Sequence, residues 1–234
     1  MVSPSPFAKN PGQGLRFQSP PAYAPTDRLQ GVPRPHPGGR VDVNAALAAL
    51  PAALPLLAQG DIRLEPLADA HADALRRAAA EDPEIWQIYS YSLLGEGFDR
   101  WWGNVATGRT GWRYWAILWR GRLVGCTGVW PEDRTPGVVE VGGTYLRPDA
   151  RGTPVNRTAK WLLLGFLFDC GFHRVEFRVD DRNRRSQAAV LKLGAVRDGI
   201  LRHHKITHNG HVRDTHVFAI LDRVWARIEP ALRP

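Results

Sequence analysis

Apolar and polar residues alternate in several short stretches from residue 61 onward, which is the pattern of half-buried β-strands. The first stretch is DIRLEPL, residues 61–67. RYWAILW and RLVGCTGVW, residues 113–119 and 122–130, flank an Arg120-Gly121 turn and predict a β-hairpin. VVEVGGTYL, residues 138–146, predicts the next strand.

Helical patterns separate these strands from a second group of strands. They cover residues 69–82, 84–91, 98–107 and 158–170, and a segment that ends at Gly194. RVEFRV, residues 174–179, is a strand by the same alternation, and two more strands follow Gly194 around an Asn209-Gly210 turn. The order predicts a mixed α/β (α+β) fold with a mostly antiparallel sheet of six to seven strands.

The first part of the chain has a different composition. Residues 1–40 hold nine of the 19 prolines and five glycines, and such a segment buries too little apolar surface to offset its ordering entropy. We therefore expect a disordered extension over residues 1–58, with a short apolar helix within 41–58, and a domain over 59–234. Pro51 and Pro55 interrupt the most apolar run, so no membrane span is expected.

Composition and charge exclude few functional classes for this protein. The chain has 234 residues, 44% of them hydrophobic, and a net charge of +8. A basic surplus suits a polyanionic cofactor, an acidic partner or nucleic acid equally well. The two cysteines, Cys126 and Cys170, have no metal-binding spacing, so we expect a reducing, cytoplasmic setting and no metal.

The strongest chemical signal is TYLRPDARGTPVNRTAK, residues 144–160, where a strand leads through a basic loop into a helix. The first turn of a helix leaves backbone N–H groups without intrahelical partners and carries partial positive charge, which suits a pyrophosphate. Arg147, Arg151 and Arg157 add charge there, and Gly152 allows a ligand to approach the backbone closely. An ordinary turn with solvated arginines is the competing interpretation.

Two further blocks follow this loop in order. DDRNRRSQAAVLKLGAV places Asn183 and Ser186 before a helix that ends at Leu193-Gly194, and a hairpin follows. Over residues 60–225 this order resembles the GNAT superfamily of acyl-CoA-dependent N-acyltransferases, in particular the branch similar to RimJ and RimL. The resemblance implies that the central strands splay apart and hold acyl-CoA between them.

Residue by residue, the resemblance implies the following cofactor contacts. Backbone groups of Tyr145, Leu146 and Arg147 would bind the pantetheine arm. Asn183 would contact the same arm, and the pyrophosphate would lie against Arg151, Gly152, Thr153, Val155, Asn156 and Arg157. Pro154 and Asn156 depart from the usual R/Q-x-x-G-x-G/A pattern, and Pro154 removes one N–H donor.

Amine acetylation needs a base for the ammonium and an acid for the departing thiolate. Ser186 matches the family position whose hydroxyl lies near the thioester, although capping of the helix would also explain a serine there, and Asn183 could likewise be only a cap. Glu140 is the candidate base, because alternation puts it on the face shared with Gly142 and Thr144. A solvated glutamate on an edge strand is the alternative.

The acceptor region is rich in aromatic residues. Seven of the nine tryptophans lie between residues 86 and 130, and one of Trp101 and Trp102 is expected to line the acceptor pocket. Trp115 and Trp119 alternate on a strand and belong either to the core or to a homodimer interface.

From the resemblance we expect an acetyl-CoA-dependent N-acetyltransferase that acts on a primary amine by direct transfer in a ternary complex. A catalytically silent CoA-binding domain and a nucleic-acid-binding module are the alternatives, and the second lacks interleaved basic and aromatic motifs.

Overall fold

The computed structural model describes residues 49–131 and 135–234. The expected disorder of residues 1–40 and most of the helix expected within 41–58 lie outside this part. Within residues 49–58 the prediction of a helix is wrong, because this segment contains no helix and Leu57–Gln59 forms a strand. Leu57 pairs with Leu64 and is fully buried in the hydrophobic core, so this part of the segment joins the sheet as a strand and does not pack on the domain as a helix.

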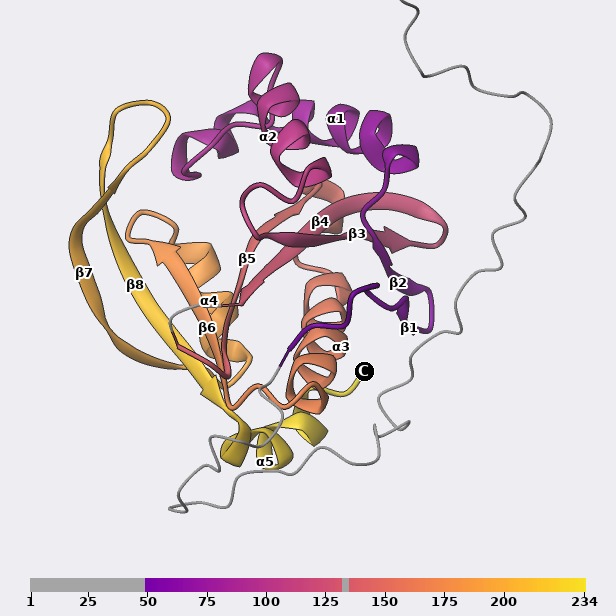
Figure 1. Cartoon of the computed structure of the whole chain (residues 1–234), viewed down its shortest axis with the longest axis vertical. Helices are drawn as coiled ribbons and strands as arrows, with labels where there is room; N and C mark the ends of the chain where they lie inside the picture. Colours follow the sequence, from indigo (N-terminus) through magenta and orange to yellow (C-terminus); the bar gives the residue numbers. More distant parts are fainter. Residues whose placement is uncertain (1–48, 132–134) are drawn as a thin grey trace, which may run out of the picture.

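The regular elements follow the predicted order, with two additions that sequence analysis missed, a strand at Leu57–Gln59 before them and a helix at Asp222–Leu232 after them (Figure 1). The strands are β1 (Leu57–Gln59), β2 (Ile62–Pro66), β3 (Arg113–Trp119), β4 (Arg122–Pro131), β5 (Val138–Leu146), β6 (Arg174–Asp180), β7 (Val196–Ile206) and β8 (Val212–Leu221). The helices are α1 (Ala72–Ala80), α2 (Glu96–Ala106), α3 (Val155–Asp169), α4 (Arg184–Lys192) and α5 (Asp222–Leu232), with 3₁₀ helices η1 (Asp69–His71), η2 (Pro83–Ile88) and η3 (Pro148–Ala150).

The strands form one sheet in the order β1-β2-β3-β4-β5-β6-β8-β7. Among the described strands, only β5 and β6 pair in parallel, so the predicted mixed, mostly antiparallel sheet is confirmed. The sheet has eight strands in the described residues, and the one that sequence analysis missed is β1.

Helices cover both faces of the sheet, and each face has its own core. In Figure 1, α1 and α2 lie on one side of the sheet and α3 on the other. On the α3 side, the core joins α3 to buried residues of β1 through β6 and to Leu232 of α5. On the other side, α1, η2 and α2 pack against Tyr114, Cys126 and Tyr145. The sheet is thus fixed from both sides along its central strands.

β5 and β6 separate after a short paired segment. They are in register only at Val138–Glu140 against Arg174–Glu176, and β5 then continues to Leu146 alongside β4 alone. The β4–β5 register shifts between Cys126 and Gly128, opposite Gly143 and Thr144, which marks a β-bulge. The predicted splay of the central strands is therefore present.

Glycine is required at this bulge. Gly143 has a φ of +55°, and a Cβ built there would lie 2.7 Å from the Tyr114 hydroxyl oxygen. A Cβ at Gly128 on the adjacent strand would lie 2.6 Å from Tyr114 Cε1. The Tyr114 ring thus occupies the space that side chains would need at both positions, and only glycine allows this close packing.

Gly143→Ala is expected to lower the free energy of unfolding by roughly 1–3 kcal/mol, because it adds a steric contact to an unfavourable positive φ. Urea unfolding measures this difference. Gly199→Ala is the matched control, since a Cβ at Gly199 would meet no atom within 4 Å, and its stability should stay close to that of the wild type. Equal stability of Gly143→Ala and the wild type would show that the bulge is not under this constraint.

Candidate active site

A cavity of about 860 Å³ opens where β5 leaves β6. It extends from the loop before α3, along the freed part of β5, to the segment between η2 and α2 and to the β7–β8 hairpin. Seven of the predicted site residues line it, namely Glu140, Leu146, Arg151, Gly152, Asn156, Asn183 and Ser186. The cavity therefore joins the three sequence blocks that were identified separately.

The remaining predicted residues lie beside the cavity. The Tyr145 hydroxyl donates to the Ala78 carbonyl at 2.5 Å, and Val155 is fully buried. The Thr153 hydroxyl donates to the Ala150 carbonyl at 2.7 Å. Arg157 donates to the carbonyls of Leu232 and Ala231, so its guanidinium binds the end of α5 and adds no charge to the loop. Its place in the first turn of α3 directs the side chain away from the cavity, a direction that the sequence does not reveal.

The freed edge of β5 presents few backbone groups to the cavity. The Arg147 N–H donates to the Val124 carbonyl at 2.8 Å, so it faces β4. Backbone groups alternate between the two edges of a strand, which turns the Leu146 N–H toward the cavity. On the same edge, the Thr144 carbonyl accepts a hydrogen bond from the Tyr89 hydroxyl at 2.6 Å. Of the three predicted backbone contacts, the N–H of Leu146 is the one directed at the cavity.

The first turn of α3 offers backbone donors at one end of the cavity. Its first intrahelical bond runs from the Thr158 N–H to the Pro154 carbonyl at 2.9 Å, so Pro154 is the N-cap. The N–H groups of Asn156 and Arg157 precede that bond and have no acceptor within the helix. Gly152, with a φ of +74°, has open space around its Cα. This arrangement suits an anion.

Arg151 is held at the same end. Its guanidinium forms an ion pair with Asp82 through Nη1, and Nε donates to the Leu146 carbonyl at 2.8 Å. Its Nη2 is buried and has no hydrogen-bond partner among the described residues. A buried N–H without a partner is costly, so the two N–H groups of Arg151 Nη2 favour an acceptor from a ligand.

Glu140 lies further along the cavity, on β5. Its side chain is nearly buried, at 9% exposed, and burial raises the pKa of its carboxyl group, while Arg178 and Lys205 oppose the rise. Arg178 Nε is 3.6 Å from Glu140 Oε2. Glu140 shares its face with Gly142, as predicted, but the bulge at Gly143 turns Thr144 to the α3 side, so the prediction for Thr144 is wrong.

Asn183 and Ser186 have separate roles at the start of α4. Asn183 is the N-cap, and its Oδ1 accepts the Ser186 N–H at 3.0 Å. The capping role thus belongs to Asn183, and the Ser186 hydroxyl is not needed for it. Both residues line the cavity. Ser186 therefore brings a hydroxyl group to the cavity wall opposite β5.

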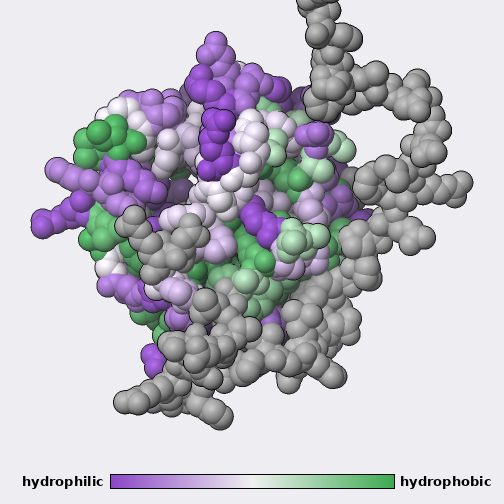
Figure 2. Space-filling view, in the orientation of Figure 1, coloured by the Kyte–Doolittle hydropathy of each residue, from purple (hydrophilic) through white to green (hydrophobic). Residues whose placement is uncertain are grey.

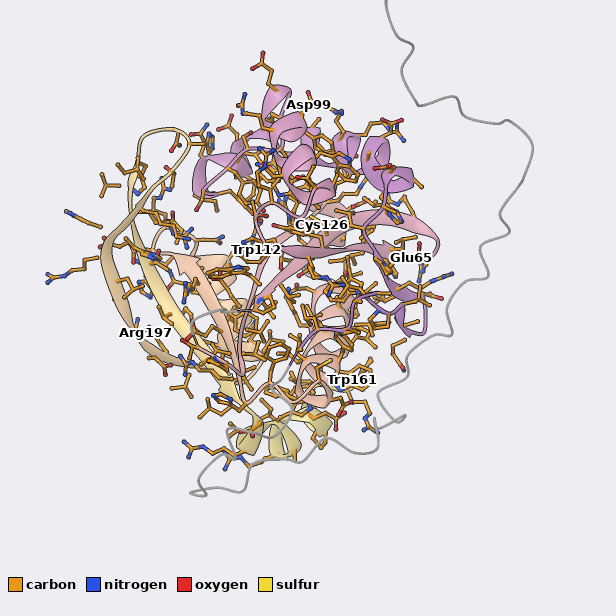
Figure 3. The ribbon with its side chains drawn as sticks, in the orientation of Figure 1. Glu65, Asp99, Trp112, Cys126, Trp161 and Arg197 are labelled. Atoms are coloured by element: carbon orange, nitrogen blue, oxygen red, sulfur yellow. The ribbon has the colours of Figure 1, made fainter. Side chains whose placement is uncertain are left out.

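Aromatic side chains form the wall on the α2 side. Trp112 lies near the centre of the view in Figure 3, and its ring stacks on those of Tyr114 and Trp130 at centroid distances of 5.9 and 6.4 Å. Trp101 lines the cavity, while its neighbour Trp102 stacks on Phe98. Trp115 is fully buried in the core.

In the described part of the chain, no three or more His, Cys, Asp or Glu side chains are grouped as metal ligands would be. Of the histidines on the β7–β8 hairpin, His216 pairs with Asp181 at 2.8 Å and His208 contacts the Trp86 carbonyl at 2.8 Å.

No helix within the described residues is long and apolar enough to cross a membrane.

Residues 61–196 match the family model described as "Acetyltransferase (GNAT) domain", which is more than half of the chain. The chain belongs to the GNAT acetyltransferase family. It is an N-acetyltransferase by this membership, and the fold agrees with those of solved GNAT structures. No curated protein matches the sequence.

Solved structures share this GNAT fold over most of their length. A GCN5-related N-acetyltransferase from Brucella melitensis is 26% identical, with a TM-score of 0.70, over 76% of this chain and 83% of its own. The Mycobacterium smegmatis protein RimJ, solved with CoA-disulfide, is 19% identical, with a TM-score of 0.60, over 68% of this chain and 81% of its own. At this identity, the comparison with RimJ shows that the two proteins share a fold.

Lys160 lines the cavity and is a residue that sequence analysis missed. It lies on α3, 5% exposed, and its Nζ donates to the hydroxyls of Thr127 and Thr144 at 2.8 and 2.6 Å. Burial lowers the pKa of its amine to about 7. The nearby Cys126 thiol has a pKa raised by burial to about 12, so it stays neutral. A lysine within the otherwise apolar AKWLLLGF run was the available signal.

The buried amine predicts a pH-dependent stability. Below pH 7 the amine is charged in both the folded and the unfolded chain, and its burial cost is fully present. Between about pH 7 and pH 10 the folded chain loses the proton first, so wild-type stability should rise relative to Lys160→Met by up to about 1.4 kcal/mol per pH unit. Urea unfolding across this range measures the difference.

Lys192→Met is the control, because Lys192 is exposed on α4 and lies outside the cavity. Its curve of stability against pH should run parallel to that of the wild type. Parallel curves for Lys160→Met and the wild type would instead mean that the Lys160 amine keeps an ordinary pKa.

Proposed function

We propose that this protein transfers the acetyl group of acetyl-CoA directly to a primary amine, with both substrates bound at once. One observation carries the proposal. The divergence of β5 from β6 creates a single cavity with anion-binding backbone groups of α3 at one end and the Glu140 carboxyl group further along it. A cofactor with a pyrophosphate and a reactive thioester requires such a separation of groups.

The residues present fit acetyl-CoA. The N–H groups between Arg151 and Arg157, with the Arg151 Nη2, would hold the pyrophosphate. The backbone of Leu146 and the side chain of Asn183 would hold the pantetheine arm, whereas the backbone N–H of Arg147 faces β4 and does not take the predicted part in it. Related folds support this role, since RimJ was solved with CoA-disulfide and the microcin C7 self-immunity protein MccE with acetyl-CoA and AMP.

Glu140 and Ser186 would carry the proton transfers. Glu140 removes a proton from the ammonium, directly or through water, and its raised pKa improves it as a base near neutral pH. The neutral amine then forms a C–N bond at the thioester carbonyl carbon as the C–S bond breaks. The departing thiolate takes a proton from the Ser186 hydroxyl, which regains one from solvent.

Direct transfer is favoured over a covalent acetyl-enzyme. Cys126 is buried, and its raised pKa keeps the thiol protonated and a poor nucleophile. Cys170 is also buried, with a pKa raised to about 12. Two free thiols are also in keeping with the proposed cytoplasmic setting. A protein N-terminus is the acceptor favoured by the likeness to RimL, a ribosomal L7/L12 alpha-N-protein acetyltransferase, and a small amine is the alternative.

A catalytically silent CoA-binding domain is the second candidate. It is favoured by Pro154, which removes one N–H from the phosphate-binding turn, and by the ion pair that occupies Glu140. In that case acetyl-CoA binds and no acetyl group moves.

Two measurements together test these candidates. Calorimetry should detect acetyl-CoA binding at micromolar concentrations, and thiol release should appear with at least one member of a panel of peptides and small amines. Glu140→Gln and Ser186→Ala should each lower turnover by about 100-fold or more and leave the Kd for acetyl-CoA nearly unchanged, because both act on proton transfer.

Glu84→Gln is the control, since Glu84 is exposed and lies outside the cavity. Binding without thiol release from any amine would support the silent domain. No binding would reject both candidates, and normal turnover of either site variant would remove that residue from the mechanism.

We also propose a homodimer through β7. This strand is at the edge of the sheet and is exposed along nearly its whole length. The large exposed apolar residues of the described chain gather there and nearby, namely Leu191, Val196, Ile200, Leu201, Ile206 and Val212. Figure 2 shows green patches beside purple ones along the left edge, where β7 lies in Figure 1. An open apolar edge strand favours pairing with a second copy.

Light scattering after gel filtration should therefore give twice the mass of one chain. Ile206→Glu should shift the protein to a single chain, because it puts a charge at the proposed interface. A single-chain mass for the wild-type protein at micromolar concentration would reject the homodimer.

A further inference from the structure

Two cations face each other across the β7–β8 hairpin at the acceptor side of the cavity. Lys205 is the direct cross-strand partner of Arg213, and both residues line the cavity. Directly opposed side chains of an antiparallel pair lie on the same face, and like charges in this position destabilise the sheet. The repulsion between Lys205 and Arg213 therefore destabilises the hairpin, and two opposed cations are not needed to form a β-hairpin.

Arg213 is buried and only partly bonded. Its side chain is 7% exposed, with Nη1 donating to the Ser90 hydroxyl and Nη2 to the Arg178 carbonyl, both at 3.0 Å. Its Nε makes no hydrogen bond within the described residues. Both acceptors are neutral, so these bonds fix the orientation of the guanidinium without balancing its charge.

The acidic groups nearby are already paired with other cations. Asp180 accepts from Arg182 Nε at 3.0 Å and Nη2 at 2.9 Å, whereas Arg213 Nε is 3.8 Å from its nearer oxygen. Glu140 lies 3.6 Å from Arg178. Lys205 has no ion pair within 4.0 Å in the described part of the chain. Lys205 is thus without an ion pair among these residues, and Arg213 shares the Asp180 carboxylate with Arg182 at the longer distance of 3.8 Å, so the two charges are only partly balanced at the cavity wall.

The hairpin is fixed in place across the acceptor side. His208 Nε2 contacts the Trp86 carbonyl at 2.8 Å, and the Asn209 side chain donates to Gln87 Oε1 at 2.8 Å. These contacts, with the bond to Ser90, tie β7 and β8 to η2 and the loop after it. The first turn of α3 belongs to the other face of the sheet, so the two cationic regions serve different parts of the cavity.

From this arrangement we propose that the acceptor amine carries an oxyanion, a carboxylate or a phosphate, that is bound by Arg213 and Lys205. The inference rests on the proposed acetyl transfer and defines its acceptor. The oxyanion would pair with the Lys205 ammonium and the Arg213 guanidinium, and would reduce the repulsion between the two cations. The acceptor amine would then lie between this anchor and Glu140.

Matched pairs of amines test the proposal. One pair is phenylalanine and 2-phenylethylamine, which differ in a carboxylate, and the other is phosphoethanolamine and ethanolamine, which differ in a phosphate. Thiol release from acetyl-CoA is compared at equal concentrations of the neutral amine. For at least one pair, kcat/KM should be higher for the anionic member by about tenfold or more, the scale of one charge-assisted hydrogen bond.

Substitutions test whether the preference for an anionic acceptor depends on Lys205 and Arg213. Lys205→Gln and Arg213→Gln should abolish the preference through a raised KM for the anionic acceptor, with the Kd for acetyl-CoA unchanged. Arg202→Gln is the matched control, since Arg202 is an exposed β7 residue outside the cavity lining and carries the same charge. Because Arg213 is buried, Arg213→Lys serves as a second variant that keeps a cation, and it should retain part of the preference.

The outcomes separate this proposal from the proposed function. Acetylation of both members of each pair at equal rates would overturn the oxyanion anchor and leave the acetyltransferase activity established. A raised Kd for acetyl-CoA in Lys205→Gln, with an unchanged amine preference, would assign the cations to the cofactor and also overturn it. Absence of acetyl-CoA binding by the wild type would instead reject the proposed function.

Discussion

The packing of the Tyr114 ring against Gly128 and Gly143 determines the shape of the site. It occupies the space of two absent side chains and lies against the bulge at which β5 changes the direction of its side chains. Beyond this point β5 has left β6, and one edge of the strand is free. The cavity and the unpaired Leu146 N–H depend on that divergence, and Glu140 lies at its start, in the last position of β5 that pairs with β6.

The order of elements could be predicted because strand alternation and helix periodicity are local properties of the sequence. β1 was missed, since three residues within a proline-rich apolar segment show no alternation, and only pairing with β2 makes them a strand. The side of the sheet reached by Thr144 was predicted wrongly for a related reason. Alternation assumes an unbroken strand, and one bulged residue reverses every face after it.

The site could be predicted where its parts are close in sequence. Asn183 and Ser186 are three residues apart, so the sequence places a cap at this helix start, and the structure shows that Asn183 is the cap. Lys160 and Arg213 could not be assigned in this way. The partners of Lys160 are on β4 and β5, and Arg213 is held by Ser90 and by the backbone of β6. Only the folded chain brings these groups together.

The cations of the hairpin also act on the candidate base. Burial raises the pKa of Glu140, whereas Arg178, Lys205 and Arg213 lower it. An oxyanion bound by Lys205 and Arg213 would offset part of their field, and the pKa of Glu140 would rise further. The carboxylate would then be a stronger base when an acceptor is bound than in the free enzyme. The same two side chains would thus select the acceptor and couple its binding to deprotonation of its amine.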